Sequence, residues 1–165
     1  MSGVATEAGR LAGRLAGEMP RPVVILGVGN PLRSDDGAGP AFVALLPELP
    51  GLMALDCGAA PHNMIGPALS GSPASALIVD CGALGGEPGA AAIMAPDSLA
   101  NEVLYTDGAA MPLLIERLRE GGISRISALV FQPRTVAVGE GLSEVVELSV
   151  CAAAAGFAAS FRQSS

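Results

Sequence analysis

Short apolar runs alternate with longer segments of helical periodicity along most of the chain. The run PVVILGVG at 22–29 is continuous and ends in glycines, which predicts a buried strand. Further runs predict strands at 51–56, 74–80, 89–95 and 127–131. Helices are expected from about 36 to 49, at 63–69, after Pro96, at 112–120 and at 142–162. This alternation predicts an α/β fold: a single-domain three-layer sandwich with a twisted, mostly parallel five-stranded sheet and helices on both faces.

The segment 1–21 precedes the first predicted strand and is interpreted as a frayed or helical N-terminal extension, which leaves 22–163 as the folded domain. Charged residues interrupt its apolar positions, which argues against a signal peptide. The apolar stretch 145–161 contains Glu147 and several serines, so a buried helix is expected there rather than a membrane span.

Composition narrows the classes of partner. The 165 residues favour one domain, and the formal net charge of −7 argues against a general affinity for nucleic acid or an anionic membrane. Three scattered cysteines do not make a disulfide framework, which favours the cytoplasm. Without a coiled-coil pattern or a large apolar stripe, a monomer is expected.

Carboxylates follow two of the predicted strands. Asp35 and Asp36 come after the first strand, and Asp80 ends the third. Because sites in such folds form at the carboxyl ends of the strands, Asp36 and Asp80 are expected to converge. Together they can ligate a divalent cation or serve as acid and base. The alternative for Asp35 and Asp36 is capping of the helix that follows them.

A dinucleotide site is a weaker interpretation of the same loop. Gly27 and Gly29 fit the beginning of a GxGxxG fingerprint, but position 32 is leucine. Asp56 has the spacing of a ribose-binding acid. However, two carboxylates near the start of a helix would repel a pyrophosphate.

A nucleophilic site has little support. No GxSxG motif is present, and the single histidine is His62. Cys57 or Cys81 could pair with it, but a buried cysteine is more often an inert, small hydrophobic residue. The same three side chains are softer candidates for metal ligands, although their spacing matches no known ligand motif.

A series of segments carries a resemblance to a known family. The stretch GVGNPLRSDDGAGP at 27–40 resembles the GxGNxxxxDDGxGP signature of the hydrogenase maturation endopeptidases. Five further segments resemble segments of that family and occur in the same order: ALDCGAAP, LIVDCGAL, EPGAAAIMAPDSLA, AMPLLIERLRE and VFQP. The resemblance covers roughly residues 22–160.

The resemblance implies an α/β sandwich that removes a short C-terminal peptide from the precursor of the large subunit of a nickel–iron hydrogenase, after nickel insertion. The nickel is carried by the substrate, and no organic cofactor is implied. Two carboxylates and a histidine bind the metal, and the carboxylates fall on Asp36 and Asp80. The resemblance also implies roles in shaping the first loop, for Gly27, Gly29, Asn30, Asp35 and Gly37.

The histidine is where this chain departs from the family. The family places it just before the helix expected here at 112–120, but this sequence reads YTDGAAMP at 105–112. Alignment without a gap puts Asp107 at that position, and a local gap puts Ala109 there. His62 lies in a different loop and could approach only if that loop folds over the same edge of the sheet. A carboxylate in place of the imidazole makes the site harder and more negative.

Two functions therefore stay open at the level of the sequence. The first is an active endopeptidase that recognises the metal of its substrate. The second is a homologue without catalytic activity that binds a hydrogenase subunit or an accessory protein and checks metal loading.

Overall fold

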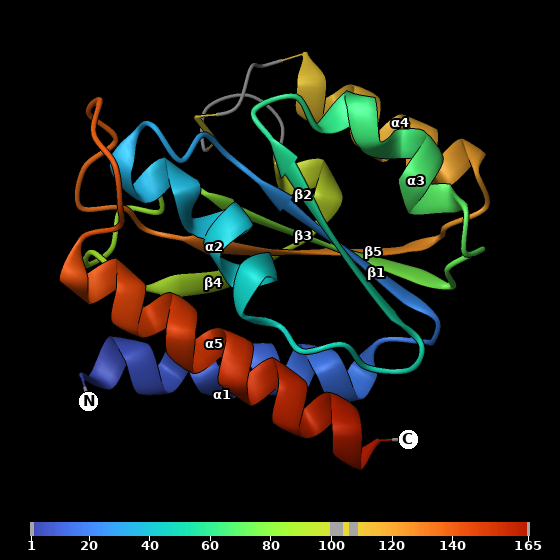
Figure 1. The fold of residues 1–165 in the computed structure, drawn as a ribbon, viewed down its shortest axis with the longest axis horizontal. Helices are drawn as coiled ribbons and strands as arrows, with labels where there is room; N and C mark the ends of the chain where they lie inside the picture. The colour runs from blue at the N-terminus through green and yellow to red at the C-terminus, as the bar shows by residue number, and fades with distance from the viewer. Residues whose placement is uncertain (1, 100–103, 106–108, 165) are drawn as a thin grey trace.

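The sheet has the predicted architecture. In a computed structural model, which describes residues 2–99, 104–105 and 109–164, five strands form one sheet in the order β2-β1-β3-β5-β4 (Figure 1). All neighbouring strands are parallel except β4, which runs antiparallel to β5. The strands are β1 (Val23–Val28), β2 (Leu52–Gly58), β3 (Ser75–Cys81), β4 (Ala91–Met94) and β5 (Arg125–Phe131).

The two central strands are apolar without interruption because both of their faces are covered. Every residue of β1 and β3 is buried. Side chains alternate between the two cores: Val23 and Ile25 enter one cluster, and Val24 and Leu26 enter the other. This explains the continuous apolar run from which β1 was predicted.

Helices cover both faces, as predicted. One cluster is formed with α1, α2 and α5, and the other with α3 and α4. In Figure 1, α1 and α5 lie on one side of the strands, and α3 and α4 lie on the other. The helices are α1 (Gly3–Glu18), α2 (Ala38–Leu45), α3 (Ile65–Leu69), α4 (Ala110–Glu120) and α5 (Glu144–Gln163). Short 3-10 helices are η1 (Ser34–Gly37), η2 (Pro61–Met64) and η3 (Pro96–Leu99).

The N-terminal segment forms a regular helix that packs along α5. The two helices approach closely at glycines: a Cβ atom at Gly156 would overlap the carbonyl oxygen of Gly9. Small buried residues of α1, including Ala8 and Ala12, join the core cluster around α5. The segment is therefore helical over Gly3–Glu18, and the division of the chain into 1–21 and 22–163 stays a prediction.

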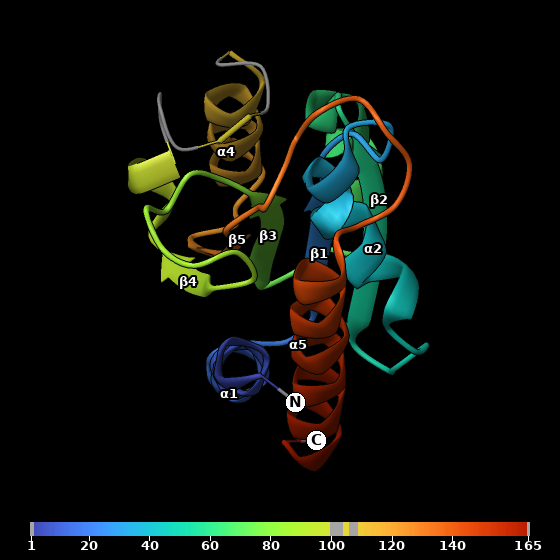
Figure 2. The same cartoon turned by 90° about the vertical axis from the view of Figure 1, so that its left-hand side faces the viewer.

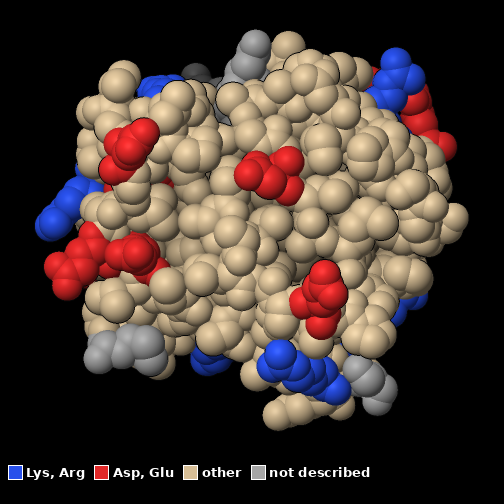
Figure 3. Space-filling model, in the orientation of Figure 1, with Lys and Arg blue, Asp and Glu red and all other residues tan. Residues whose placement is uncertain are grey.

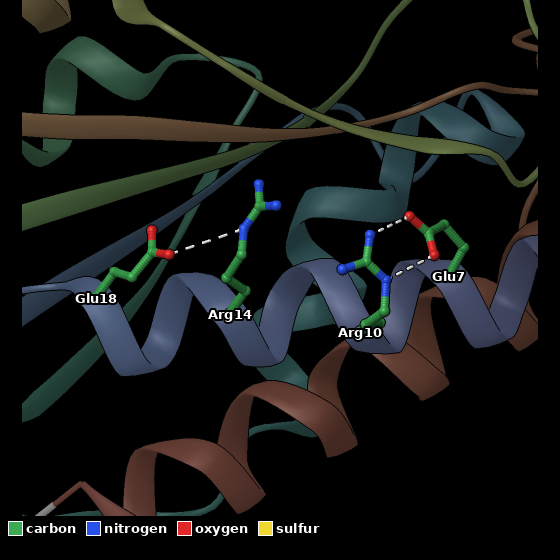
Figure 4. Close-up of polar contacts among 4 residues, drawn as sticks. All are labelled: Glu7, Arg10, Arg14 and Glu18. Carbon is green, nitrogen blue, oxygen red and sulfur yellow. Dashed lines mark hydrogen bonds and ion pairs between the residues drawn. The ribbon is translucent and has the colours of Figure 1, made fainter.

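The charged residues of α1 lie on its solvent side in two pairs. Arg10 contacts Glu7 at 2.6 Å, and Arg14 lies 3.9 Å from Glu18 (Figure 4). Their side chains are roughly half exposed, so each pair adds little stability. These charged residues interrupt the apolar positions of the segment 1–21, as noted from the sequence.

The second helix is shorter than predicted. It was expected over 36–49, but α2 begins at Ala38, after the tight turn of η1. It ends at Leu45, and Leu46 is extended. The helix stops there because Pro47 disfavours the helical conformation of the residue before it.

Among the described helices, α5 is long and apolar enough to cross a membrane by length and composition alone. In this structure its buried residues, such as Val150 and Phe157, belong to the core cluster shared with α1 and α2. The core of a folded domain therefore accounts for its apolar character.

Candidate active site

The chain changes direction across the sheet next to β1. From β1 it passes to β2 at the edge, and from there to β3 on the other side of β1. In open α/β sheets, ligands bind at such a switch point, outside the carboxyl ends of the strands. Asp36 follows β1 and Asp80 lies near the end of β3, so both candidates lie at this edge.

Glycines hold the loop after β1 close to the sheet. Gly29 has φ +139°, and a Cβ atom there would overlap the carbonyl oxygen of Asp36. A Cβ atom at Gly27 would collide with the backbone of Gly39 at the start of α2, and one at Gly37 would lie 3.0 Å from the Cα atom of Pro31. Side chains at these positions would push η1 and α2 away from the strand ends.

Asp36 is a buried carboxylate with one unpaired oxygen. It is only 3% exposed, and its Oδ2 atom accepts a hydrogen bond of 3.0 Å from the N–H of Asn30. Its Oδ1 atom is buried and has no hydrogen-bond partner among the described residues. Burial raises the pKa of Asp36 above its ordinary value, although the Asn30 N–H and the charge of Arg33 lower it. A buried acceptor without a partner is unfavourable, so a ligand at Oδ1 would relieve this cost.

Asp80 is completely buried at the end of β3. Its Oδ1 atom accepts a hydrogen bond of 2.7 Å from the N–H of Cys81. By strand alternation, its side chain belongs to the face of Ala76 and Ile78, which α3 and α4 cover.

The carboxylates act electrostatically on a common neighbour. Burial raises the pKa of the Cys81 thiol, and the charges of Asp80, Asp36 and Asp35 raise it further, in that order. A thiol in this environment stays protonated and is a poor nucleophile. Asp36 and Asp80 thus both lie near enough to Cys81 to act on its thiol, and Cys81 itself is an inert core residue.

Asp35 does not cap the helix after it, contrary to the expectation. Neither η1 nor α2 has a capping hydrogen bond from a side chain. Asp35 is fully buried, and its Oδ2 atom accepts hydrogen bonds from the N–H groups of Arg134 (2.8 Å) and Thr135 (3.1 Å) and from the hydroxyl of Ser143 (2.9 Å). Its Oδ1 atom accepts from the N–H of Ser143 (2.7 Å). Asp35 therefore ties the segment 134–143, between β5 and α5, to the loop after β1.

The chain is similar to proteins of known activity. It is 37% identical over 117 residues to the hydrogenase 3 maturation protease of Escherichia coli K12, a match that covers 68% of this chain and 74% of that protein. The chain belongs to the hydrogenase maturation protease family. No protein-family model matches it.

Solved structures of hydrogenase maturation proteases share the fold. The HycI protease of Thermococcus kodakarensis KOD1 superposes with a TM-score of 0.81 at 26% identity, over 92% of this chain and 99% of that one. The endopeptidase HycI of Escherichia coli gives a TM-score of 0.69 at 31% identity, over 78% and 83% of the two chains. The α/β sandwich expected from the resemblance is thereby confirmed.

The softer candidates do not complete a metal site with the two aspartates among the described residues. His62 is exposed on η2, after β2, and the described residues contain no cluster of three or more histidine, cysteine, aspartate or glutamate side chains that could hold a metal ion. Asp107, which alignment without a gap puts at the position of the family's histidine, lies outside the described residues.

The cysteine–histidine interpretation loses its basis. Cys57 is 6% exposed, and its thiol lies 3.7 Å from the carbonyl oxygen of Leu55. Burial, together with the charge of Asp56, raises the pKa of Cys57 to about 12. The thiolate that a nucleophile requires is therefore absent at neutral pH.

One further residue at this edge was missed by the sequence analysis. Gln132 follows β5 and its Oε1 atom accepts a hydrogen bond of 2.6 Å from the N–H of Leu84, in the loop after β3. It thus links the loops after two neighbouring strands. Its position in the VFQP segment, directly after a predicted strand, was the available signal.

Proposed function

We propose that this chain is an endopeptidase, a hydrolase that removes a C-terminal peptide from the nickel-loaded precursor of the large subunit of a nickel–iron hydrogenase. The observation that carries the proposal is the buried Asp36, whose Oδ1 atom has no partner among the described residues, at the same edge of the sheet as the buried Asp80. Similarity to named maturation proteases and endopeptidases supports it and favours it over a homologue that only checks metal loading.

In this proposal the metal belongs to the substrate. Nickel held by the precursor contacts Asp36 and Asp80, and the scissile peptide bond lies beside it. A metal ion at this place can polarise the scissile carbonyl or lower the pKa of a bound water. A carboxylate of the pair can accept the proton of that water. No organic cofactor takes part.

The low exposure of the two carboxylates suits this chemistry. Electrostatic interactions are stronger where water is excluded, so a cation that reaches Asp36 and Asp80 gains more than it would at an exposed acidic patch. Asp107 stays a candidate for a third contact, and His62 is a weaker one because it is exposed on η2.

We also propose that the protein acts as a monomer in the cytoplasm, with the precursor as its partner and without binding to nucleic acid or a membrane. The acidic net charge of −7 supports the last two points. On the face drawn in Figure 3, acidic and basic side chains are scattered, and no basic patch for a phosphate backbone is visible there.

The test is cleavage of a nickel-loaded and a nickel-free precursor, with the products weighed by mass spectrometry. Wild type should shorten only the loaded form. The variants Asp36→Asn and Asp80→Asn should lose activity, whereas Asp97→Asn, an exposed aspartate on η3 that pairs with Arg119, should keep it. Normal cleavage by either of the first two variants would refute the proposed site. Binding of the loaded precursor without cleavage by wild type would establish the checking role instead.

A further inference from the structure

Two apolar side chains project into solvent beside the proposed site. Leu32 is 60% exposed and Val138 is 91% exposed, more than any other large hydrophobic residue that the structure describes. Leu32 lies in the loop between β1 and η1, four residues before Asp36, and Val138 lies in the segment between β5 and α5. Isolated exposed hydrophobic residues are common, but two on adjoining loops at a catalytic edge form a surface.

Hydrogen bonds hold these two loops together. The N–H of Gly139 donates a hydrogen bond to the carbonyl oxygen of Leu32 (2.9 Å). The N–H of Ser34 donates one to the carbonyl oxygen of Gly139 (2.8 Å). The hydroxyl of Ser34 donates to the carbonyl oxygen of Ala137 (2.9 Å). In Figures 1 and 2 the orange segment between β5 and α5 lies beside the start of α2. The apolar side chains are therefore presented by a backbone that is fixed from both sides.

A hollow lies beside the loop that carries Leu32. This hollow has a volume of about 300 Å³ and is lined mainly by apolar residues, among them Pro31, Pro40 and Leu142, with one carboxylate, Asp56. Pro31 is adjacent to Leu32 in the chain, and the same hollow includes Ser34 and Gly37, which flank the two aspartates of η1. The apolar surface and the proposed metal contact thus share one loop.

We propose that Leu32, Val138 and this hollow form the docking surface for the hydrogenase precursor, and that they bind an apolar stretch of it next to the scissile bond. The inference rests on the proposed function. The loop that carries Leu32 begins at Asn30, whose N–H donates to the carboxylate of Asp36, so a substrate whose metal reaches Asp36 comes close to this loop. The precursor is therefore the occupant that the geometry favours over a second copy of this chain.

The test separates binding from chemistry. The double variant Leu32→Ser, Val138→Ser is compared with Leu148→Ser, which changes an apolar side chain on α5 that is 44% exposed. With nickel-loaded precursor as the substrate, the double variant should raise KM about tenfold with little change in kcat, as expected when binding common to ground and transition states is lost. The Leu148→Ser control should keep both constants, and the melting temperatures of the variants should match that of wild type.

Each outcome has a distinct meaning. An unchanged KM in the double variant, with an active wild type, would overturn the docking surface and leave the proposed function intact. A lower kcat at unchanged KM would also overturn it, because the residues would then act on the chemistry. A wild type that dimerises in sedimentation, and a double variant that does not, would assign the surface to a second copy of the chain. A wild type that does not cleave would instead refute the proposed function.

Discussion

Asp35 should stabilise the protein strongly without taking part in the proposed chemistry. Its buried carboxylate accepts four hydrogen bonds, three at Oδ2 and one at Oδ1, from Arg134, Thr135 and Ser143. Hydrogen bonds to a charged group contribute about 1.5–3 kcal/mol each, roughly twice as much as neutral ones. Asparagine can keep three of the four acceptor contacts at most, and its NH₂ group then faces another donor. We expect Asp35→Asn to lower the free energy of unfolding by about 2 kcal/mol and Asp35→Ala by about 3–4 kcal/mol.

Urea unfolding followed by circular dichroism measures these differences, and for a chain of this size 2 kcal/mol corresponds to a fall in melting temperature of about 4–8 °C. The matched control is Asp56→Asn, because Asp56 is exposed and accepts one local hydrogen bond, from Gly58 (2.9 Å). That variant should stay within about 0.5 kcal/mol of wild type. Hydrogen exchange at 134–143 gives a second readout, since these amides should lose protection in the Asp35 variants. Equal stability of Asp35→Asn and Asp56→Asn would refute the reasoning.

Three other changes test burial and packing. Because burial raises the pKa of Asp36 above 3.8, the protonated form favours folding, and that contribution is lost as the pH rises through the folded-state pKa. Asp36→Asn should therefore unfold at a higher temperature than wild type at pH 7, with the gain vanishing below pH 4; a gain that persists in acid would contradict this. Native protein should react with one equivalent of a thiol reagent at pH 7.5, at the exposed Cys151. Cys57 and Cys81 should be labelled only after unfolding, because both thiols are buried and stay protonated. Peptide mapping of the labelled native protein shows which cysteine has reacted, and a label at Cys57 or Cys81 would contradict the prediction. Gly156→Ala should lower the free energy of unfolding by about 1–3 kcal/mol, because the added methyl group would overlap a backbone carbonyl of α1; unchanged urea unfolding would argue against that packing.

The parts of the fold that follow from local pattern were predictable. The apolar runs of β1 and β3 are continuous because both faces of the sheet are covered, and the order of strands and helices then restricts the topology to few choices. The start of α2 was not predictable at this level. Aspartate is a common residue at the start of a helix, so Asp35 and Asp36 suggested that the helix begins there. Instead, the chain packs tightly against Gly29 and forms the 3-10 turn η1 before α2 begins.

The roles of the two adjacent aspartates could not be separated by sequence either. Asp35 finds its partners about a hundred residues further along the chain, in the segment after β5. Asp36 instead has a local partner, the N–H of Asn30, which satisfies only one of its oxygens. Local propensity contains no information about such long-range contacts. By contrast, the position of Asp36 and Asp80 at one edge followed from the parallel order of β1 and β3.

Two carboxylates are an incomplete site for a resident metal ion. Nickel and zinc sites in proteins are completed by three or more ligands, usually with imidazole or thiolate among them, and the described residues supply no such cluster. If Asp36 and Asp80 are the contacts, most ligands must come from the precursor, so affinity arises only after the metal has been inserted there. We therefore expect calorimetric titration with nickel alone to show no tight binding, while the loaded precursor binds and the nickel-free precursor binds more weakly. Tight, stoichiometric binding of nickel by this chain alone would contradict the prediction, because the chain itself would then supply a full set of metal ligands.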